Sequence, residues 1–141
     1  MGMVIGQKEL AASQKLYRLL IYGYVASDDS VSVNKAVAEE LLKFKPNRRT
    51  MQLEKCFNKV LDTLPEGSVI EGIDVMFNPS YKVDVLALLI AAYKRKSFSL
   101  IWPGRIEDDK LIYSEEGYPD YRAYEISNYD IVCVIQRGGA Q

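Results

Sequence analysis

The sequence predicts an α/β fold with a mainly parallel sheet. The stretch from Ser68 to Gly104 has the pattern of a strand, a loop, a helix and a second strand, which is the repeating unit of a parallel sheet. Apolar residues recur at helical spacing from Val83 to Tyr93. The apolar run Phe98–Trp102 then ends at Pro103-Gly104, which turns the chain.

Length and composition favour a single domain. The chain has 141 residues, of which 48% are hydrophobic, enough for one core and too few for two comfortable domains. We expect one domain over residues 1–141, with a helical lead-in over 1–14 and a frayed tail over 137–141. The net charge is -1, so no overall field attracts nucleic acid or an anionic membrane.

The residue types present exclude several kinds of chemistry. The chain has no histidine, which excludes a histidine-based catalytic group and the usual zinc sites, and no metal site is predicted. Cys56 and Cys133 fall in a predicted helix and a predicted strand, where a free cysteine packs as a small hydrophobe. No apolar run approaches the roughly 20 residues that span a bilayer, and the first residues lack the pattern of a signal peptide. We therefore expect a cytoplasmic protein without a membrane partner.

The remaining elements follow from apolar spacing and turn residues. The helix predicted over about Glu54–Leu64 is expected to direct Cys56, Phe57, Val60 and Leu61 inward. Asp108-Asp109 is expected to form a hairpin-like turn. Asn78-Pro79 is expected to open the helix that contains Val83. The other predicted helices are Lys8–Gln14, a helix capped by Ser32 or Asn34 with Val37, Ala38, Leu41, Leu42 and Phe44 on one face, and about Glu54–Leu64. The other predicted strands are Leu16–Tyr24, Thr50–Leu53, Ser68–Ile70, Lys110–Ser114, Tyr121–Ile126 and Ile131–Ile135.

The loop after the first core strand has the frame of a phosphate-binding loop. That motif is Gly, four residues, Gly-Lys and then Ser or Thr, placed between a strand and a helix. Here Gly23 and Ser30 occupy the first glycine and the hydroxyl positions, whereas Asp28 and Asp29 replace the second glycine and the lysine. The lysine normally neutralises the phosphates, and Asp29 would instead bring a negative charge against them. An acidic, solvated loop is the alternative interpretation.

A second part of the nucleotide-hydrolase pattern follows the Ser68 strand. In those enzymes an aspartate at a strand end holds magnesium. Here Glu71 follows the strand and could hold a magnesium-bound water, while Gly72 takes the place of the usual catalytic glutamate. Glu71 and Asp74 have an alternative interpretation as solvent-exposed carboxylates at a strand end.

Three runs of residues resemble a known family. They are Ile73–Leu89, Trp102–Arg105 and Leu111–Tyr124, and they are similar to BrxF, the small P-loop protein of one type of BREX bacteriophage-exclusion system. The resemblance is strongest from Val69 to Ile135 and weaker over Tyr17–Leu64. It implies a P-loop NTPase-like three-layer core, with helices on both sheet faces and an antiparallel addition over Lys110–Ile126. It also implies a place in an antiviral defence complex, beside a methyltransferase, a phosphatase-like protein and a large ATPase.

Three functions stay open. The first is a subunit with a degenerate Walker A loop that does not hydrolyse nucleotide, has no cofactor and binds other proteins. The second is a nucleoside triphosphatase, in which Ser30 and Glu71 hold magnesium for ATP and Lys35 or Arg105 supplies the cation. The third is a nucleic-acid-contacting subunit with two basic clusters, which are Lys43, Lys45, Arg48 and Arg49, and Lys94, Arg95 and Lys96. We favour the first, and expect no turnover of ATP or GTP and a mobile loop over Val25–Ser32.

The end of the Trp102 strand is a candidate protein-binding surface. Ligands of α/β sheets bind at the carboxyl ends of strands, and tryptophan, tyrosine and arginine dominate the energetics of interfaces. We expect Trp102 to be partly exposed, with Arg105 and Tyr118 beside it. The alternative is that Trp102 belongs to the core.

Overall fold

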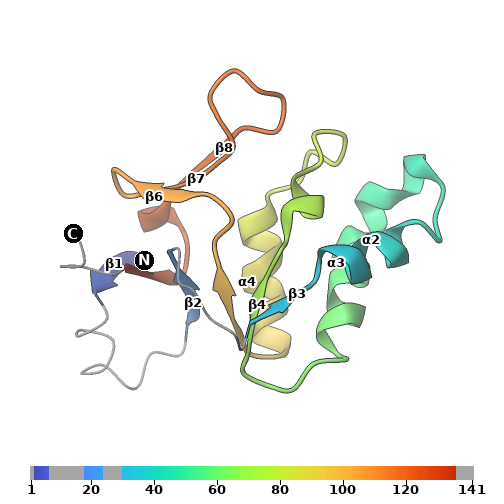
Figure 1. Ribbon diagram of the computed structural model, residues 1–141, viewed down its shortest axis with the longest axis horizontal. Helices are drawn as coiled ribbons and strands as arrows, with labels where there is room; N and C mark the ends of the chain where they lie inside the picture. Colours follow the sequence, from blue (N-terminus) through green and yellow to red (C-terminus); the bar gives the residue numbers. More distant parts are fainter. Residues whose placement is uncertain (1, 7–17, 24–29, 136–141) are drawn as a thin grey trace.

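The computed structural model describes residues 2–6, 18–23 and 30–135, and its main element is a six-stranded sheet (Figure 1). All its paired strands are parallel, in the order β1-β9-β2-β5-β4-β3. The mainly parallel α/β sheet predicted from the sequence is confirmed, with six strands instead of about five. Their bounds are β1 Met3–Gly6, β2 Leu19–Tyr22, β3 Val31–Ser32, β4 Ser68–Glu71, β5 Phe98–Ile101 and β9 Ile131–Ile135.

A second sheet is antiparallel and lies between β5 and β9 in the sequence. It has the order β6-β7-β8, with bounds Arg105–Glu107, Lys110–Tyr113 and Arg122–Glu125. The β6–β7 hairpin turns at Asp108 and Asp109, whose φ angles are 53° and 60°, a left-handed conformation that aspartate tolerates better than most residues. The predicted antiparallel addition is therefore confirmed, and Figure 1 shows it projecting away from the parallel sheet.

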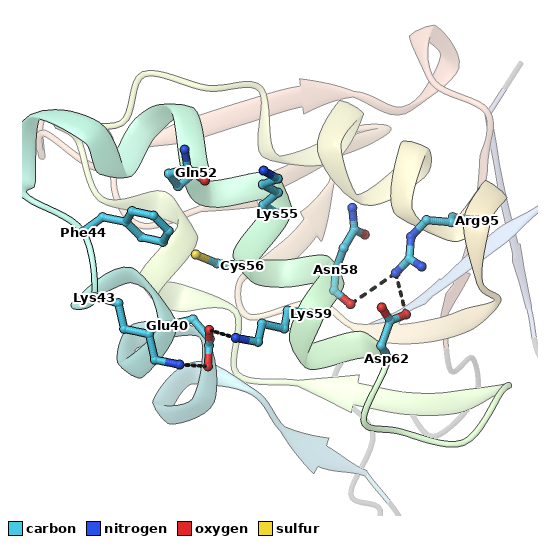
Figure 2. A pocket seen from close by; sticks show the side chains of 10 residues that line it. All are labelled: Glu40, Lys43, Phe44, Gln52, Lys55, Cys56, Asn58, Lys59, Asp62 and Arg95. Atoms are coloured by element: carbon cyan, nitrogen blue, oxygen red, sulfur yellow. Dashed lines mark hydrogen bonds and ion pairs between the residues drawn. The ribbon is translucent and has the colours of Figure 1, made fainter.

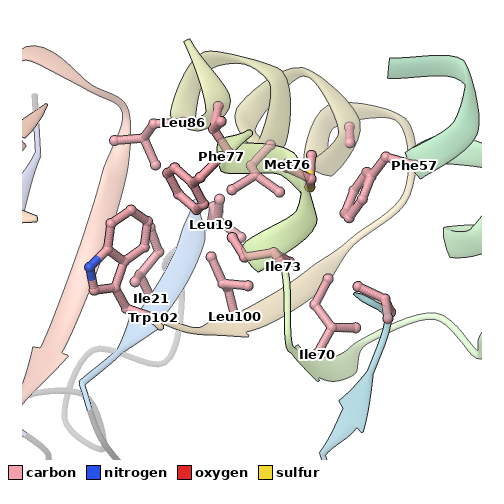
Figure 3. Close-up of a cluster of buried hydrophobic side chains, with 14 of the residues drawn as sticks. Leu19, Ile21, Phe57, Ile70, Ile73, Met76, Phe77, Leu86, Leu100 and Trp102 are labelled. Carbon is pink, nitrogen blue, oxygen red and sulfur yellow. The ribbon is translucent and has the colours of Figure 1, made fainter. Parts of the chain in front are cut away.

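The three described helices, α2 Asn34–Leu41, α3 Arg49–Leu61 and α4 Val85–Arg95, belong to one hydrophobic core. Their buried residues pack with one face of the sheet, including Ile21, Ile70 and Leu100 (Figure 3). A separate cluster on the other face consists of Ile5, Val132 and Val134 with the half-buried Leu20 and Tyr22. The predicted helix Lys8–Gln14 lies outside the described residues, so helices on both faces remain a prediction.

Two predicted segments are wrong. Met3–Gly6 is not part of a helical lead-in but an edge strand paired with Val132–Ile135 of β9. Residues 50–53 are not a strand, because a 3-10 helix at Pro46–Arg48 leads directly into α3. Leu53 is buried on the same face as Phe57 and Val60, so the apolar run at the start of α3 follows the helical period of the residues after it.

Helix starts and ends also differ from the expectation. Neither Ser32 nor Asn34 caps α2, since Val33 occupies that position without a side-chain bond. Leu42, predicted to face inward, lies past the end of the helix and is 67% exposed. Asn78-Pro79 does not open α4, which begins at Val85 after Asp84 accepts a hydrogen bond of 3.0 Å from the Ala87 amide. An aspartate cap satisfies an amide of the first turn better than Asn78-Pro79 would.

Both cysteines are buried and free, as predicted. Burial raises the pKa of the Cys133 thiol to about 12, so it is protonated and packs as a hydrophobe. Among the helices of the described residues, none combines the length and the apolar character needed to cross a bilayer.

Candidate functional site at the carboxyl edge of the sheet

The carboxyl ends of β2, β5 and β4 lie in one row, the edge at which open α/β sheets bind ligands. Tyr22 at the end of β2 is in register with Ile101 at the end of β5, and the Tyr22 carbonyl accepts a hydrogen bond of 2.9 Å from the Trp102 amide. On the β4 side, Glu71 is in register with Ser32 of β3. The chain therefore leaves β2 at this edge through Gly23, whereas Ser30, at the other end of the predicted phosphate loop, precedes the amino end of β3.

A pocket of about 350 Å³ lies at this edge. Its wall on one side is the end of β4 and the start of the following 3-10 helix, Asp74–Phe77, and its wall on the other is the turn after β5. The lining residues are Glu71, Gly72, Asp74, Ile101, Trp102, Pro103 and Gly104. Two of them are carboxylates and none is a lysine or arginine.

Two of the residues predicted for nucleotide binding meet in the structure. The Ser30 hydroxyl donates a hydrogen bond to a carboxylate oxygen of Glu71 across 41 positions of sequence. Ser30, however, does not open a helix as the hydroxyl residue of a phosphate loop does. It precedes β3, which pairs with β4 and is not a neighbour of β2 in the sheet, and α2 begins only at Asn34.

The remaining loop positions carry less of the pattern. The Gly23 amide donates a hydrogen bond of 3.0 Å to the Val134 carbonyl. A Cβ at Gly23 would meet nothing closer than Ile106 Cδ1 at 3.6 Å, an ordinary contact, so neither space nor backbone conformation requires glycine there. Asp28 and Asp29 lie outside the described residues, as do positions 25–29 of the loop expected to be mobile.

Asp74 is held by residues that the sequence analysis did not identify as part of a site. The Asn34 amide nitrogen donates to Asp74 Oδ1 at 3.2 Å, and the Tyr113 hydroxyl donates to Asp74 Oδ2 at 3.1 Å. Asn34 Oδ1 also accepts from the Val75 amide at 2.8 Å, which explains why its side chain does not cap α2. These contacts join residues 39 to 41 positions apart, and no local pattern signals them.

Tyr113 links this edge to the core. Its ring stacks on Phe77 with centroids 4.0 Å apart and an interplanar angle of 10°. Burial, together with the charge of Asp74 and the hydrogen bond to it, raises the pKa of Tyr113 to about 12. Tyr113 therefore stays a neutral hydrogen-bond donor at physiological pH.

Gly72 fixes the shape of the pocket beside Glu71. Its φ is +65°, and a Cβ placed on it would lie 2.2 Å from the Ser32 hydroxyl oxygen. The residue that stands where hydrolases have their catalytic glutamate thus has no room for a side chain without a rearrangement of β3.

The cations predicted to serve a nucleotide lie elsewhere. Arg105 pairs with Glu107 at 3.3 Å and Glu115 at 3.7 Å, and Lys35 does not line the pocket. Nor do the described residues contain a group of three or more acidic or cysteine side chains placed to hold a metal ion. The described part of the pocket is therefore acidic, a setting that repels a free polyphosphate.

The prediction that Trp102 is partly exposed is wrong. Its side chain is 2% exposed, and its indole nitrogen donates a hydrogen bond of 2.9 Å to the Ile112 carbonyl. The ring makes edge contacts with Phe77 and Tyr124 at 5.7 and 6.2 Å between centroids, and Figure 3 shows it within the hydrophobic cluster. Trp102 therefore belongs to the core, and its contacts with Ile112 and Tyr124 connect the end of β5 to the antiparallel sheet. Tyr118 is 63% exposed, so the three residues do not form the expected surface.

The comparisons with known proteins add no relative. No family model matches the chain, and neither a curated protein nor a solved structure shows significant similarity to it.

Proposed function

We propose that this chain is a subunit that does not hydrolyse nucleotide and that acts by binding other proteins, in a bacteriophage-exclusion complex of the BREX kind. The observation that carries the first part is the charge of the pocket at the carboxyl edge. Glu71 and Asp74 line it without a lysine or arginine, and the sequence between Gly23 and Ser30 adds two aspartates and no cation.

The energetic argument concerns the triphosphate. Nucleotide hydrolases stabilise the β- and γ-phosphates with a lysine, backbone amides and magnesium. A triphosphate in the described pocket would face the carboxylates of Glu71 and Asp74 without a lysine or arginine, and each like-charge contact opposes binding more strongly in a partly buried site than in water. Ser30 and Glu71, the two groups available for magnesium, bond to each other. The place in phage exclusion rests on the sequence resemblance alone.

The experiment measures nucleotide binding and turnover together. Purified chain is incubated with Mg-ATP or Mg-GTP, and phosphate release and the melting temperature are recorded. We expect no release above the blank and no melting shift at 5 mM nucleotide. A nucleotide that bound would be detected, because a ligand at 100 times its Kd stabilises the folded chain by about 2.7 kcal/mol. Turnover that disappears in both Ser30→Ala and Glu71→Ala would favour the alternative of an ATPase with an atypical loop.

The interaction role is tested in cells. The tagged chain is expressed with the proteins encoded beside its own gene, and stoichiometric co-purification is expected with one of them. Phage plating then compares wild type with Glu71→Ala, which should retain protection. Loss of protection by that variant, with the complex intact, would contradict a function through binding alone.

A further inference from the structure

A basic hollow lies along α3 (Figure 2) and shares no lining residue with the carboxyl-edge pocket. Its volume is about 620 Å³. Residues from the end of α2, from α3 and from the end of α4 line it, so three helices contribute to one concave surface. The charged lining residues are the cations Lys43, Lys55, Lys59 and Arg95 and the acids Glu40 and Asp62.

A second hollow, of about 370 Å³, shares Arg95 with the first. It adds Lys94 and Lys96 as cations and Glu66 as the acid. Together the two hollows hold six cations and three carboxylates, in a chain whose net charge is -1. The fold thus brings members of both basic clusters of the sequence, Lys43 and Lys94–Lys96, to two hollows that share Arg95, together called the groove.

The carboxylates do not cancel this charge. Glu40 accepts from both Lys43 at 2.9 Å and Lys59 at 3.0 Å, and Asp62 pairs with Arg95 at 2.8 Å. Both cations lower the pKa of Glu40, which stays ionised. Within the described ranges, Lys55 and Lys94 are exposed and form no ion pair. The Arg95–Asp62 pair is exposed on both sides, and pairs of that kind contribute little.

Helix dipoles explain only part of the pattern. Lys94 and Arg95 lie in the last turn of α4 and Lys59 in the last turn of α3, where cations are favoured by the dipole alone. Lys43 follows the end of α2, where a cation is also favoured, and pairs with Glu40. Lys55 lies in the middle of α3, and its position in the hollow has no such local cause.

Each hollow also has an aromatic ring in its wall. Phe44 lines the larger one and Tyr93 the smaller one, and both are half-buried against the core. A positively charged groove with aromatic side chains along it is the arrangement that binds single-stranded nucleic acid, because the cations follow the backbone and the rings stack with bases.

We propose that this groove binds single-stranded nucleic acid, an activity beyond the proposed role in protein binding. Lys55 and Lys94 contact phosphates, and Phe44 and Tyr93 contact bases. With about four phosphates contacted, affinity should fall about fiftyfold between 50 and 200 mM salt, since the slope is about -0.7 per contact for single strands.

The test is fluorescence anisotropy with a labelled 20-nucleotide oligothymidine at 50 mM salt. The double variant Lys55→Glu/Lys94→Glu should lose at least tenfold in affinity and show a shallower salt dependence. Its matched control is Lys35→Glu/Lys82→Glu, which makes the same change in net charge at two exposed lysines outside both hollows. The control should lose less than threefold. Tyr93→Leu should weaken binding at least threefold with an unchanged salt slope, because it removes stacking and no charge.

Four results would overturn the proposal. They are the absence of binding at 50 mM salt, equal losses in the two double variants, tighter binding of a duplex of the same length, and equal competition by poly-glutamate. The last result would show that the groove attracts acidic polypeptides as well as nucleic acid. Circular dichroism of each variant confirms that the fold is retained, and a misfolded double variant is replaced by Lys55→Gln/Lys94→Gln.

Discussion

Trp102 provides the sharpest test of the packing, because the sequence predicts it on a binding surface and the structure places it in the core. Its side chain is 2% exposed, contacts Phe77 and Tyr124 edge-on and donates a hydrogen bond to the Ile112 carbonyl. Replacing a buried tryptophan by alanine costs about 3–5 kcal/mol. For 141 residues, at about 2.1 cal/mol/K per residue, that loss lowers the melting temperature by about 10–17 °C.

The assay is urea unfolding followed by circular dichroism, for three variants. Trp102→Ala should lose about 3–5 kcal/mol. Trp102→Phe keeps most of the ring but removes the donor to Ile112, and should lose about 1–2 kcal/mol. Tyr118→Ala, at a side chain 63% exposed, should stay within about 0.5 kcal/mol of wild type. A Trp102→Ala variant within about 1 kcal/mol of wild type would refute the assignment of Trp102 to the core.

Three further predictions concern single groups. Burial and neighbouring aspartates raise the pKa of Tyr113 and Tyr129 from 10.0 to about 12. The stability that the two neutral hydroxyls contribute is therefore complete below pH 10 and lost as pH rises toward 12. In a pH titration, absorbance at 295 nm should show a phase near pH 12 that shrinks when either tyrosine is changed to Phe. Gly72→Ala should destabilise more than Gly67→Ala, because both have positive φ but only the first adds a clash; equal unfolding free energies would contradict this. Cys133, whose pKa burial raises to about 12, should resist iodoacetamide until the chain unfolds, as peptide mass spectrometry would show.

The sequence patterns predicted the strands and helices that carry a local signal. The run Phe98–Trp102 and the helix after Val83 were found because their apolar residues are continuous or recur at the helical period. Residues 50–53 were assigned to the wrong class, since four residues are too short to separate a strand from the first turn of α3. Met3–Gly6 was missed because its partner strand, β9, lies about 130 positions away.

The site was predictable only where a residue follows a strand end or fits a motif spacing. Glu71 was identified because it follows the Ser68 strand and Ser30 because of the phosphate-loop spacing, and they meet. The bonds of Asp74 to Asn34 and Tyr113 were not predictable, because they join three separate elements. The burial of Trp102 depends on its contacts with Ile112 and Tyr124 of the second sheet, and its sequence position at a strand end is equally compatible with exposure.

The most direct test of the proposed function is an NMR titration of the labelled chain with Mg-ATP. The reporters are the amides of Glu71, Gly72 and Gly104, which line the pocket at the carboxyl edge. The acidic pocket predicts no saturable shift of these amides up to 5 mM nucleotide. Shifts confined to them that saturate below 1 mM, and that disappear in Glu71→Gln, would contradict the account and establish a nucleotide site.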